Sequence, residues 1–340
     1  MRWFCLLLLA LSLSTPLLAS DLYTGEVPVP SQDEAARKEA MGEALKQVLV
    51  KVSGDPAAGE RPAVQSALAN PEPLIQAFYY RQDVDRSGPT PTLRLYYAAN
   101  FEPRAITKLL SASGLSQWAR ERPKLMVWVV GDGGGTTGFL GEAQLAPLLR
   151  RGGERGIELT AATIGDDDAS SVLLTDVERG SIDRLRPVAS SYGAPGVLAG
   201  RLYVTSEGVL GRFAFGDGER EESFEVRGAD PSAALRAAAD ETANRLASRY
   251  AFAAADSTPA AVSAVIRNIR SAADFARVHA YLASLSVVSE IRLSSAAADS
   301  MNLDLTVAGG AERLRQIVAL NAILVVAGDS SDGAVVLDLQ

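Results

Sequence analysis

The chain has 340 residues, a formal net charge of -8 and 47% hydrophobic residues. This hydrophobic content is that of a globular protein with a packed core, and the length suits two or three domains. The acidic balance argues against sequence-independent nucleic-acid binding, which needs Lys and Arg to displace counterions. It also argues against broad docking on anionic lipid.

The first twenty residues, MRWFCLLLLALSLSTPLLAS, have the layout of a secretory signal peptide. Arg2 precedes an apolar stretch from Trp3 to Leu13, and small residues follow at Ala19 and Ser20. The apolar stretch is shorter than the roughly 20 residues of a membrane helix. We therefore expect residues 1–20 to be cleaved near Ala19 or Ser20, leaving a periplasmic protein without a transmembrane span. An uncleaved anchor is the alternative.

The chain contains one cysteine, Cys5, and one histidine, His279. Cys5 lies within the predicted signal peptide and not at its cleavage point, so lipid anchoring, disulfides and cysteine metal sites are not expected in the mature chain. His279 falls in a predicted helix, and no G-x-S-x-G motif accompanies any serine. A Ser-His-Asp triad and a histidine metal site are therefore disfavoured, and we interpret His279 as a structural or surface residue.

Residues 21–121 are predicted to form an N-terminal α+β module. Its expected elements are a strand at 22–29, a helix from about 31 to 53, a short helix at 63–69, strands at 77–84 and 92–99, and a helix from 103 to about 113. Ser31 and Glu34 have the spacing of a capping box. Small apolar residues then repeat every four positions, as on the buried face of an amphipathic helix, until Gly54 ends the pattern.

The two predicted strands of this module carry clustered aromatic residues, in FYYR (78–81) and RLYYAANF (94–101). Together with arginines, such a hairpin could present a binding face for a peptide or a glycan, with Tyr79 and Arg81 as contact residues. The alternative is the ordinary alternation of strand side chains between core and surface.

Residues 122–252 are predicted to form a middle α/β module. Its expected elements are a strand at 124–130, a helix at 142–156, a strand at 156–164, a helical segment at 181–193, strands at 196–204, 208–216 and 222–228, and a helix at 231–252. Pro147 is expected to interrupt or start the first helix, and Pro187 to kink or restart the second. Gly208 and Gly218 mark hairpin turns between the later strands.

A small, polar segment at 253–261 reads as a linker, and residues 262–340 as a ferredoxin-like module. The expected order is a strand at 262–269, a helix at 272–285, strands at 287–294 and 301–307, a helix at 310–319, and strands at 322–327 and 334–338. The predicted fold class is thus α+β, with three small modules of mixed or antiparallel sheets packed with helices.

A glycine-rich stretch, VVGDGGGTTGFLG at 129–141, follows the apolar strand of the middle module. Gly133, Gly135 and Gly138 match G-x-G-x-x-G, and Glu158 stands where a ribose-binding acid could be expected. The match is weak in a run of glycines, no phosphate-binding Lys follows, and the later strands read as hairpins. We therefore expect a flexible strand-to-helix connection and no nucleotide or other cofactor. Its possible partner-contact residues are Asp132, Gly133, Gly134 and Gly135.

Asp166, Asp167 and Asp168 form the densest acidic cluster. They lack the alternating ligand spacing and late Glu of a calcium loop, so a solvated loop is the favoured interpretation. Paired carboxylates can do acid–base work without histidine. These residues and Asp132 therefore support the alternative function, a carboxylate-dependent hydrolase or ligand-binding protein acting on cell-envelope material.

Four stretches taken together resemble a family of bacterial envelope proteins, domain of unknown function 2066. They are EVPVPSQDEAARKEAMGEALKQVLVKVSGD, IQAFYYR, RPKLMVWVVGDGGG and YGAPGVLAGRLY. The order of elements in the middle module is also similar to the N-terminal unit of TolB-type translocation proteins and to curli-secretion proteins. The resemblance implies export and the cell envelope, and it brings no activity and no catalytic residues.

The leading hypothesis is therefore a non-enzymatic binding or assembly factor of the periplasm. Its partner would be an envelope protein or a peptidoglycan component, and exposed hairpin edges would recruit partner strands. A purely structural role, with the modules as spacers in a larger assembly, is a further alternative.

Overall fold

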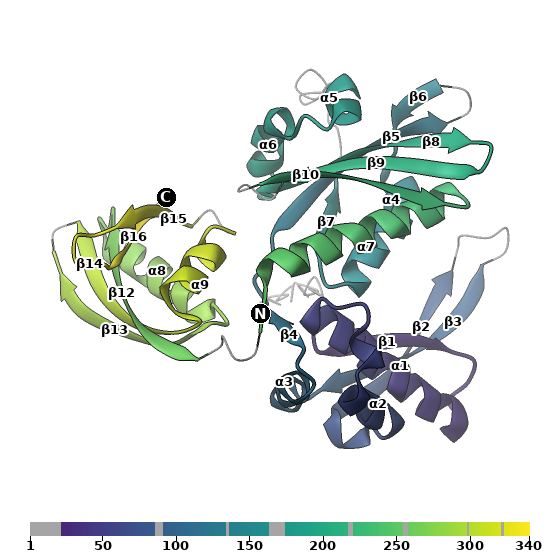
Figure 1. The fold of residues 1–340 in the computed structure, drawn as a ribbon, viewed down its shortest axis with the longest axis horizontal. Coiled ribbons are helices and arrows are strands. Elements are labelled where there is room, and N and C mark those ends of the chain that lie inside the picture. Colours follow the sequence, from purple (N-terminus) through teal and green to yellow (C-terminus); the bar gives the residue numbers. More distant parts are fainter. Residues whose placement is uncertain are drawn as a thin grey trace, which may run out of the picture.

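The computed structural model shows helices packed on four sheets, which confirms the predicted α+β fold class. It describes residues 22–85, 91–133, 136–162, 174–216, 220–253, 258–297, 299–320 and 323–340. Figure 1 shows three groups of elements that follow the chain, the first in purple and blue, the second in teal and green, and the third in yellow-green.

The N-terminal group is a three-stranded antiparallel sheet with helices on one face. Its elements are β1 (Thr24–Val29), α1 (Glu34–Ser53), η1 (Ala58–Glu60), α2 (Pro62–Ala69), η2 (Glu72–Leu74), β2 (Ile75–Asp85), β3 (Thr92–Phe101), α3 (Pro103–Ala112) and β4 (Ser116–Trp118). The sheet order is β1-β3-β2, so β2 is an edge strand. Helix α1 buries the predicted stripe, including Ala44, Leu45 and Val48, in the same core as Tyr97 of β3.

The start of α1 differs from the predicted capping box. The helix begins at Glu34, and its N-cap is Asp33, whose carboxylate accepts a hydrogen bond from the Ala36 N–H at 2.8 Å. Ser31 instead donates its hydroxyl to Asp33. Asp is as strong an N-cap as Ser, so the acid next to the first helical residue takes the role. The predicted end is confirmed, because Gly54 adopts a left-handed C-cap with φ 75°.

The middle group has helices on both faces of a mixed sheet. Its elements are β5 (Lys124–Gly133), β6 (Thr136–Phe139), α4 (Glu142–Glu154), β7 (Glu158–Ala161), α5 (Leu174–Arg179), α6 (Ile182–Ser191), β8 (Gly196–Thr205), β9 (Gly208–Gly216), β10 (Glu221–Gly228) and α7 (Pro231–Tyr250). The order is β10-β9-β8-β5, and β6 and β7 share the far side of β5. Helices α4 and α7 cover one face, and α5 and α6 cover the other.

In this group the predicted interruption of the first helix at Pro147 and the predicted new helix at Pro187 are wrong, and the kink predicted at Pro187 stays a prediction. Helix α4 runs from Glu142 through Pro147 without interruption, and α6 runs through Pro187. A proline in a helix interior costs roughly 3 kcal/mol because one backbone hydrogen bond is lost. Buried side chains on both sides of each proline, such as Leu145 and Leu148 in α4, hold the helix against the sheet. This packing offsets the local cost.

The chain then returns to the N-terminal group before it enters the third. Strand β11 (Ala251–Ala253) pairs antiparallel with β4, so the segment directly after α7 is hydrogen-bonded to residues that precede β5. The predicted linker, 253–261, only partly matches: residues 259–261 already belong to the next strand, and 254–257 lie outside the described residues.

The C-terminal group is a five-stranded sheet with two helices. Its elements are β12 (Pro259–Arg267), α8 (Ala272–Ser284), β13 (Val288–Ala296), β14 (Ser300–Ala308), α9 (Gly310–Val318), β15 (Leu324–Asp329) and β16 (Val335–Leu339). The order is β13-β14-β12-β16-β15, and β16 runs parallel to β12. The ferredoxin-like pairing is therefore not observed. In the final hairpin, which β15 and β16 form, β16 lies next to β12 and β15 lies at the edge of the sheet.

Among the described residues, no helix is both long and apolar enough to cross a membrane.

Candidate functional site

The hairpin of β2 and β3 presents an unusual amount of exposed hydrophobic surface. Four of its large apolar side chains are exposed: Phe78 (48%), Tyr79 (48%), Val84 (38%) and Leu93 (65%). The hairpin projects beyond the helices of its group (Figure 1). We call these four residues and the outer edge of β2 the hairpin surface.

One face of the hairpin surface continues the core of the N-terminal group. The ring of Phe78 stacks on buried Tyr97, with centroids 5.6 Å apart, and Tyr80 meets Tyr97 edge-on at 5.7 Å. Arg37 of α1 lies over the outer side of Phe78, 5.9 Å from its centroid. Burial raises the pKa of Tyr97 to about 12. The contact with Tyr97 thus holds one side of the Phe78 ring, and about half of the Phe78 side chain stays exposed to solvent.

The opposite face carries Tyr79 and Arg81, both predicted as contact residues. Arg81 is already engaged: its Nε donates to Glu26 of β1 at 3.1 Å, and its guanidinium lies 4.9 Å from the ring centroid of Tyr96. The hydrogen bond with Glu26 is the main reason that the pKa of Arg81 is raised. Arg81 therefore links β2 to β1 on this face of the sheet, and Tyr79 is the residue of the two that remains available to a partner.

The outer edge of β2 pairs with no other strand in the described part of the chain. Every second N–H and C=O group of an edge strand points away from its sheet. Strand β2 spans 11 residues, longer than most strands. The hairpin surface thus combines unpaired backbone groups with exposed aromatic side chains.

The predicted glycine loop is a β-hairpin in its described part. Strand β5 continues to Gly133, β6 pairs with it antiparallel, and Asp132 stands opposite Thr137. The Thr137 hydroxyl donates to Asp132 Oδ1 at 2.6 Å. Gly134 and Gly135 lie outside the described residues. The expected strand-to-helix connection is therefore wrong, because residues 136–139 extend as a strand before α4 begins.

Other sequence candidates are separated in space. Glu158 begins β7 beside Lys124, at the start of β5 and so at the opposite end from Gly133; its carboxylate lies 3.1 Å from the Lys124 ammonium. The dinucleotide interpretation fails on this geometry. His279 is exposed on α8 and stacks on Phe275 at 6.1 Å. Residues 166–168 lie outside the described residues, within which no cluster of acids, His or Cys suits a metal ion.

Two arginines, which the sequence did not single out, join the N-terminal and middle groups: Arg122 is half-buried and Arg155 is buried. Arg122 lies 3.9 Å from the ring centroid of Trp118 and donates to the carbonyl oxygens of Gly156 at 2.8 Å and Lys51 at 2.6 Å. Burial lowers its pKa to about 9, so it remains a cation at neutral pH. Lys51 belongs to the N-terminal group and Gly156 to the middle group, so Arg122 links the two.

The second arginine, Arg155, is 2% exposed. It donates to Asp240 at 2.6 Å and to Asn244 at 2.8 Å, both on α7, and to the carbonyl oxygen of Gly54 at 3.3 Å. This arginine therefore fixes the end of α1 against α7. No periodicity or motif in the sequence distinguishes it from the solvent-exposed arginines.

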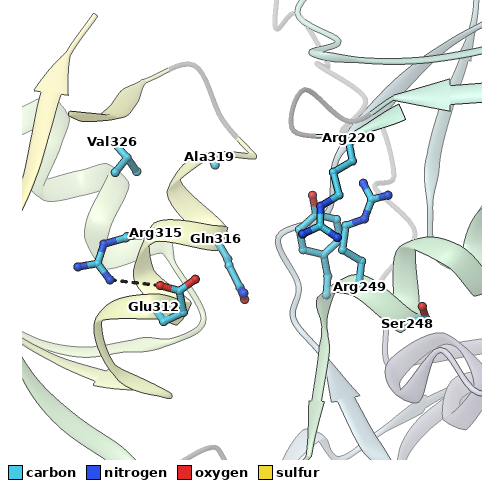
Figure 2. Close-up of a pocket in the computed structure, with 9 residues that line it drawn as sticks. Arg220, Ser248, Arg249, Glu312, Arg315, Gln316, Ala319 and Val326 are labelled. Carbon is cyan, nitrogen blue, oxygen red and sulfur yellow. Dashed lines mark hydrogen bonds and ion pairs between the residues drawn. The ribbon is translucent and has the colours of Figure 1, made fainter. Parts of the chain in front are cut away.

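A cleft of about 590 Å³ separates the end of α7 from α9 (Figure 2). Arg220 and Arg249 stand on one side, and residues of α9, among them Arg315, stand on the other. Arg249 is paired with Glu222, and Arg315 with Asp329. Arg249 and Arg315 therefore already have acidic partners, which reduces the attraction of the cleft for an anion.

One comparison with known proteins gives a match. A family model described as "Domain of unknown function (DUF8605)" matches residues 18–119. This range is less than half of the chain and extends from before β1 to the end of β4, so it contains the hairpin surface. Searches of the curated proteins and of the solved structures found no match. The resemblance to domain of unknown function 2066 stays a prediction.

Proposed function

We propose that the protein is an exported, non-enzymatic binding factor of the bacterial cell envelope that captures an extended segment of a partner protein along β2. The layout of residues 1–20 supports export, and the resemblance of four sequence stretches supports the envelope. The observation that carries the binding role is the hairpin surface, where an unpaired edge and four exposed apolar side chains coincide.

The geometry favours strand addition over other modes of peptide binding. A partner segment laid along β2 would satisfy the outward backbone groups and extend the sheet to four strands. Its side chains would alternate between the two faces of the sheet. On one face they would meet Phe78 and Val84, and on the other Tyr79. The main chain would supply affinity, and these three side chains would supply selectivity.

A photo-crosslinking experiment tests this proposal in the periplasm. A photoreactive phenylalanine analogue replaces Tyr79 in one variant and Leu293 in the control. Leu293 is a matched control because it is also 48% exposed and lies on another edge strand, β13. The proposal expects one dominant protein adduct from position 79 and none of it from position 293. Equal labelling at both positions, or adducts with peptidoglycan alone, would contradict it.

The mode of binding is tested with a synthetic peptide that spans the crosslinked segment. Tyr79→Ser is expected to weaken binding about tenfold or more, since buried aromatic contacts dominate such interfaces, whereas Leu293→Ser leaves it unchanged. Each backbone nitrogen of the peptide is then methylated in turn, one per peptide. Only every second N–H of an added strand faces β2, so methylation is expected to abolish binding at every second position and to be tolerated at the others. A loss that follows the peptide's side chains and ignores backbone methylation would exclude strand addition.

A further inference from the structure

The hydrogen bonds at the end of β3 identify which backbone groups of β2 point away from the sheet. The Phe101 N–H donates to the carbonyl oxygen of Tyr23, directly before β1, at 2.9 Å. The Glu102 N–H donates to the carbonyl oxygen of Leu74, directly before β2, also at 2.9 Å. Successive residues of a strand direct their backbone groups to opposite sides. Even-numbered residues of β3 therefore bond to β2, and odd-numbered residues bond to β1.

The register of β3 against β2 extends this alternation to β2. Ala98 of β3 stands opposite Tyr79, and the pairing is regular beyond the bulge at the start of β2. Odd-numbered residues of β2 therefore bond to β3. The next outward N–H towards the turn, that of Val84, already donates to Asp83 Oδ1 at 2.8 Å. The outward groups that a captured segment can use are thus those of Phe78, Tyr80 and Gln82.

Arg37 of α1 lies over this edge, on the face of the sheet that α1 covers. It is half-buried, and its guanidinium carbon lies 5.9 Å from the ring centroid of Phe78. Its charge also opposes the rise in the pKa of Tyr97 that burial causes. Glu72, the acid that also acts on Tyr97, forms no ion pair with Arg37, and neither does any other carboxylate of the described residues. The guanidinium therefore keeps its hydrogen-bond donors for an acceptor that arrives along β2.

The opposite face of the same edge has a different electrostatic character. Arg81 there donates to Glu26 at 3.1 Å and lies 3.3 Å from a carboxylate oxygen of Asp83. A carboxylate on this side of an added strand would meet an arginine that already has two acidic partners. An apolar side chain would instead cover the exposed ring of Tyr79. The two faces thus select different side chains.

We propose that the segment captured by β2 carries an acidic side chain that pairs with Arg37, next in sequence to an apolar side chain that packs on Tyr79. Residues of an added strand alternate between the two faces, so an acid opposite Phe78 has its neighbour opposite Tyr79. Charge complementarity with Arg37 selects the acid. The inference rests on the proposed strand capture and names the class of segment, an internal acidic stretch of a protein.

Fluorescence anisotropy with the full chain tests the proposal on a labelled peptide, acetyl-Thr-Val-Thr-Val-Glu-Val-Thr-Ser-amide. In an added strand its valines face one side and its glutamate faces the other. Matched peptides carry Gln or Lys in place of the glutamate. The Glu peptide is expected to bind at least about threefold more tightly than the Gln peptide, because a charge-assisted hydrogen bond to a half-buried arginine is lost. The Lys peptide should bind more weakly still.

Two variants locate the charge that selects the acid. Arg37→Gln should reduce the ratio of Glu-peptide to Gln-peptide affinity to about one, while the affinity for the Gln peptide stays as it is. Lys38→Gln is the matched control, because it removes the same charge from the next residue of α1, an exposed side chain that lines the groove towards α2. It should leave the ratio unchanged. An unaltered ratio in Arg37→Gln, or an equal loss of both peptides, refutes the assignment.

The outcomes separate this inference from the proposed function. Equal binding of the Glu and Gln peptides, or tighter binding of the Lys peptide, overturns the acidic selectivity and leaves strand capture standing. Failure of every peptide to bind overturns both. A shorter peptide, acetyl-Thr-Val-Thr-Val with a free carboxylate, presents a chain terminus in place of the glutamate. Tighter binding of this peptide than of the Glu peptide would overturn the assignment to an internal side chain.

Discussion

Removing the carboxylate of Asp240 should destabilise the protein far more than removing the arginine that it binds. Asp240 accepts hydrogen bonds from Arg155 at 2.6 Å and from Arg151 at 2.9 Å. Arg155 is 2% exposed, whereas the side chain of Asp240 is 33% exposed. Asp240→Ala leaves a buried cation without its counter-charge, and such losses cost about 3–5 kcal/mol. Because Asn244 and the Gly54 carbonyl still accept from Arg155, we expect about 3 kcal/mol.

The reverse substitution should be milder. Arg155→Met removes the buried charge together with its Nε, which has no hydrogen-bond partner among the described residues. Asp240 keeps Arg151 and partial contact with water. Replacing a buried ion by a hydrophobic side chain of similar volume is often nearly neutral, so we expect a cost of about 1 kcal/mol. The double variant should then be more stable than Asp240→Ala alone by about 2 kcal/mol.

Urea unfolding monitored by tryptophan fluorescence measures these differences, since buried Trp118 lies beside Arg122 at the same junction. Midpoints are compared only where the denaturant dependence is unchanged. Asp183→Ala serves as the control, because the Asp183 side chain is 83% exposed. The reasoning fails if Asp240→Ala costs no more than this control, or if the double variant shows simple addition of the two losses.

Two further predictions concern packing and pH. Gly25→Ala places a Cβ 2.3 Å from the Ala44 carbonyl oxygen and should destabilise the protein by about 1–3 kcal/mol. Gly153→Ala, in open space on α4, should stabilise the protein by up to about 1 kcal/mol. Thermal melts compare the two variants. The pKa of Tyr97 is raised from 10.0 to about 12 in the folded state. The stability that depends on the neutral Tyr97 hydroxyl is therefore fully present below pH 10 and is lost as the pH rises towards 12. Tyr97→Phe should reduce this alkaline fall in urea titrations at pH 7 and 11.5, and buried Tyr281, whose pKa is also raised to about 12, accounts for a further part of it. A fall of unchanged size in Tyr97→Phe would contradict the burial of that hydroxyl.

Local patterns predicted most elements but few of their pairings. Helix α1 and the strands β2 and β3 follow from apolar periodicity and turn residues, which act over a few positions. The pairing of β11 with β4 and the placement of β16 beside β12 depend on contacts between distant segments. No window of sequence contains these contacts. For that reason the ferredoxin-like expectation matched the element order and missed the sheet order.

The same limit explains the outcome at the candidate sites. The exposure of Tyr79 follows from strand alternation, and the sequence could indicate it. The engagement of Arg81 depends on β1 packing next to β3, which brings Glu26 within 3.1 Å. Arg122 and Arg155 look like surface residues until the N-terminal and middle groups meet. The environment of these two arginines depends on the contact between the two groups, and local sequence composition does not indicate it.

The glycine-rich stretch shows how topology can change the meaning of a motif. Its spacing suggested a phosphate loop, and the hairpin of β5 and β6 removes the strand-turn-helix geometry on which phosphate binding depends. The winding of the sheet nevertheless reverses at β5, so the stretch stands at the position where such folds bind ligands. The carboxylate of this stretch, Asp132, is exposed and accepts the Thr137 hydroxyl, so it adds a negative charge where the motif implied a site for an anion.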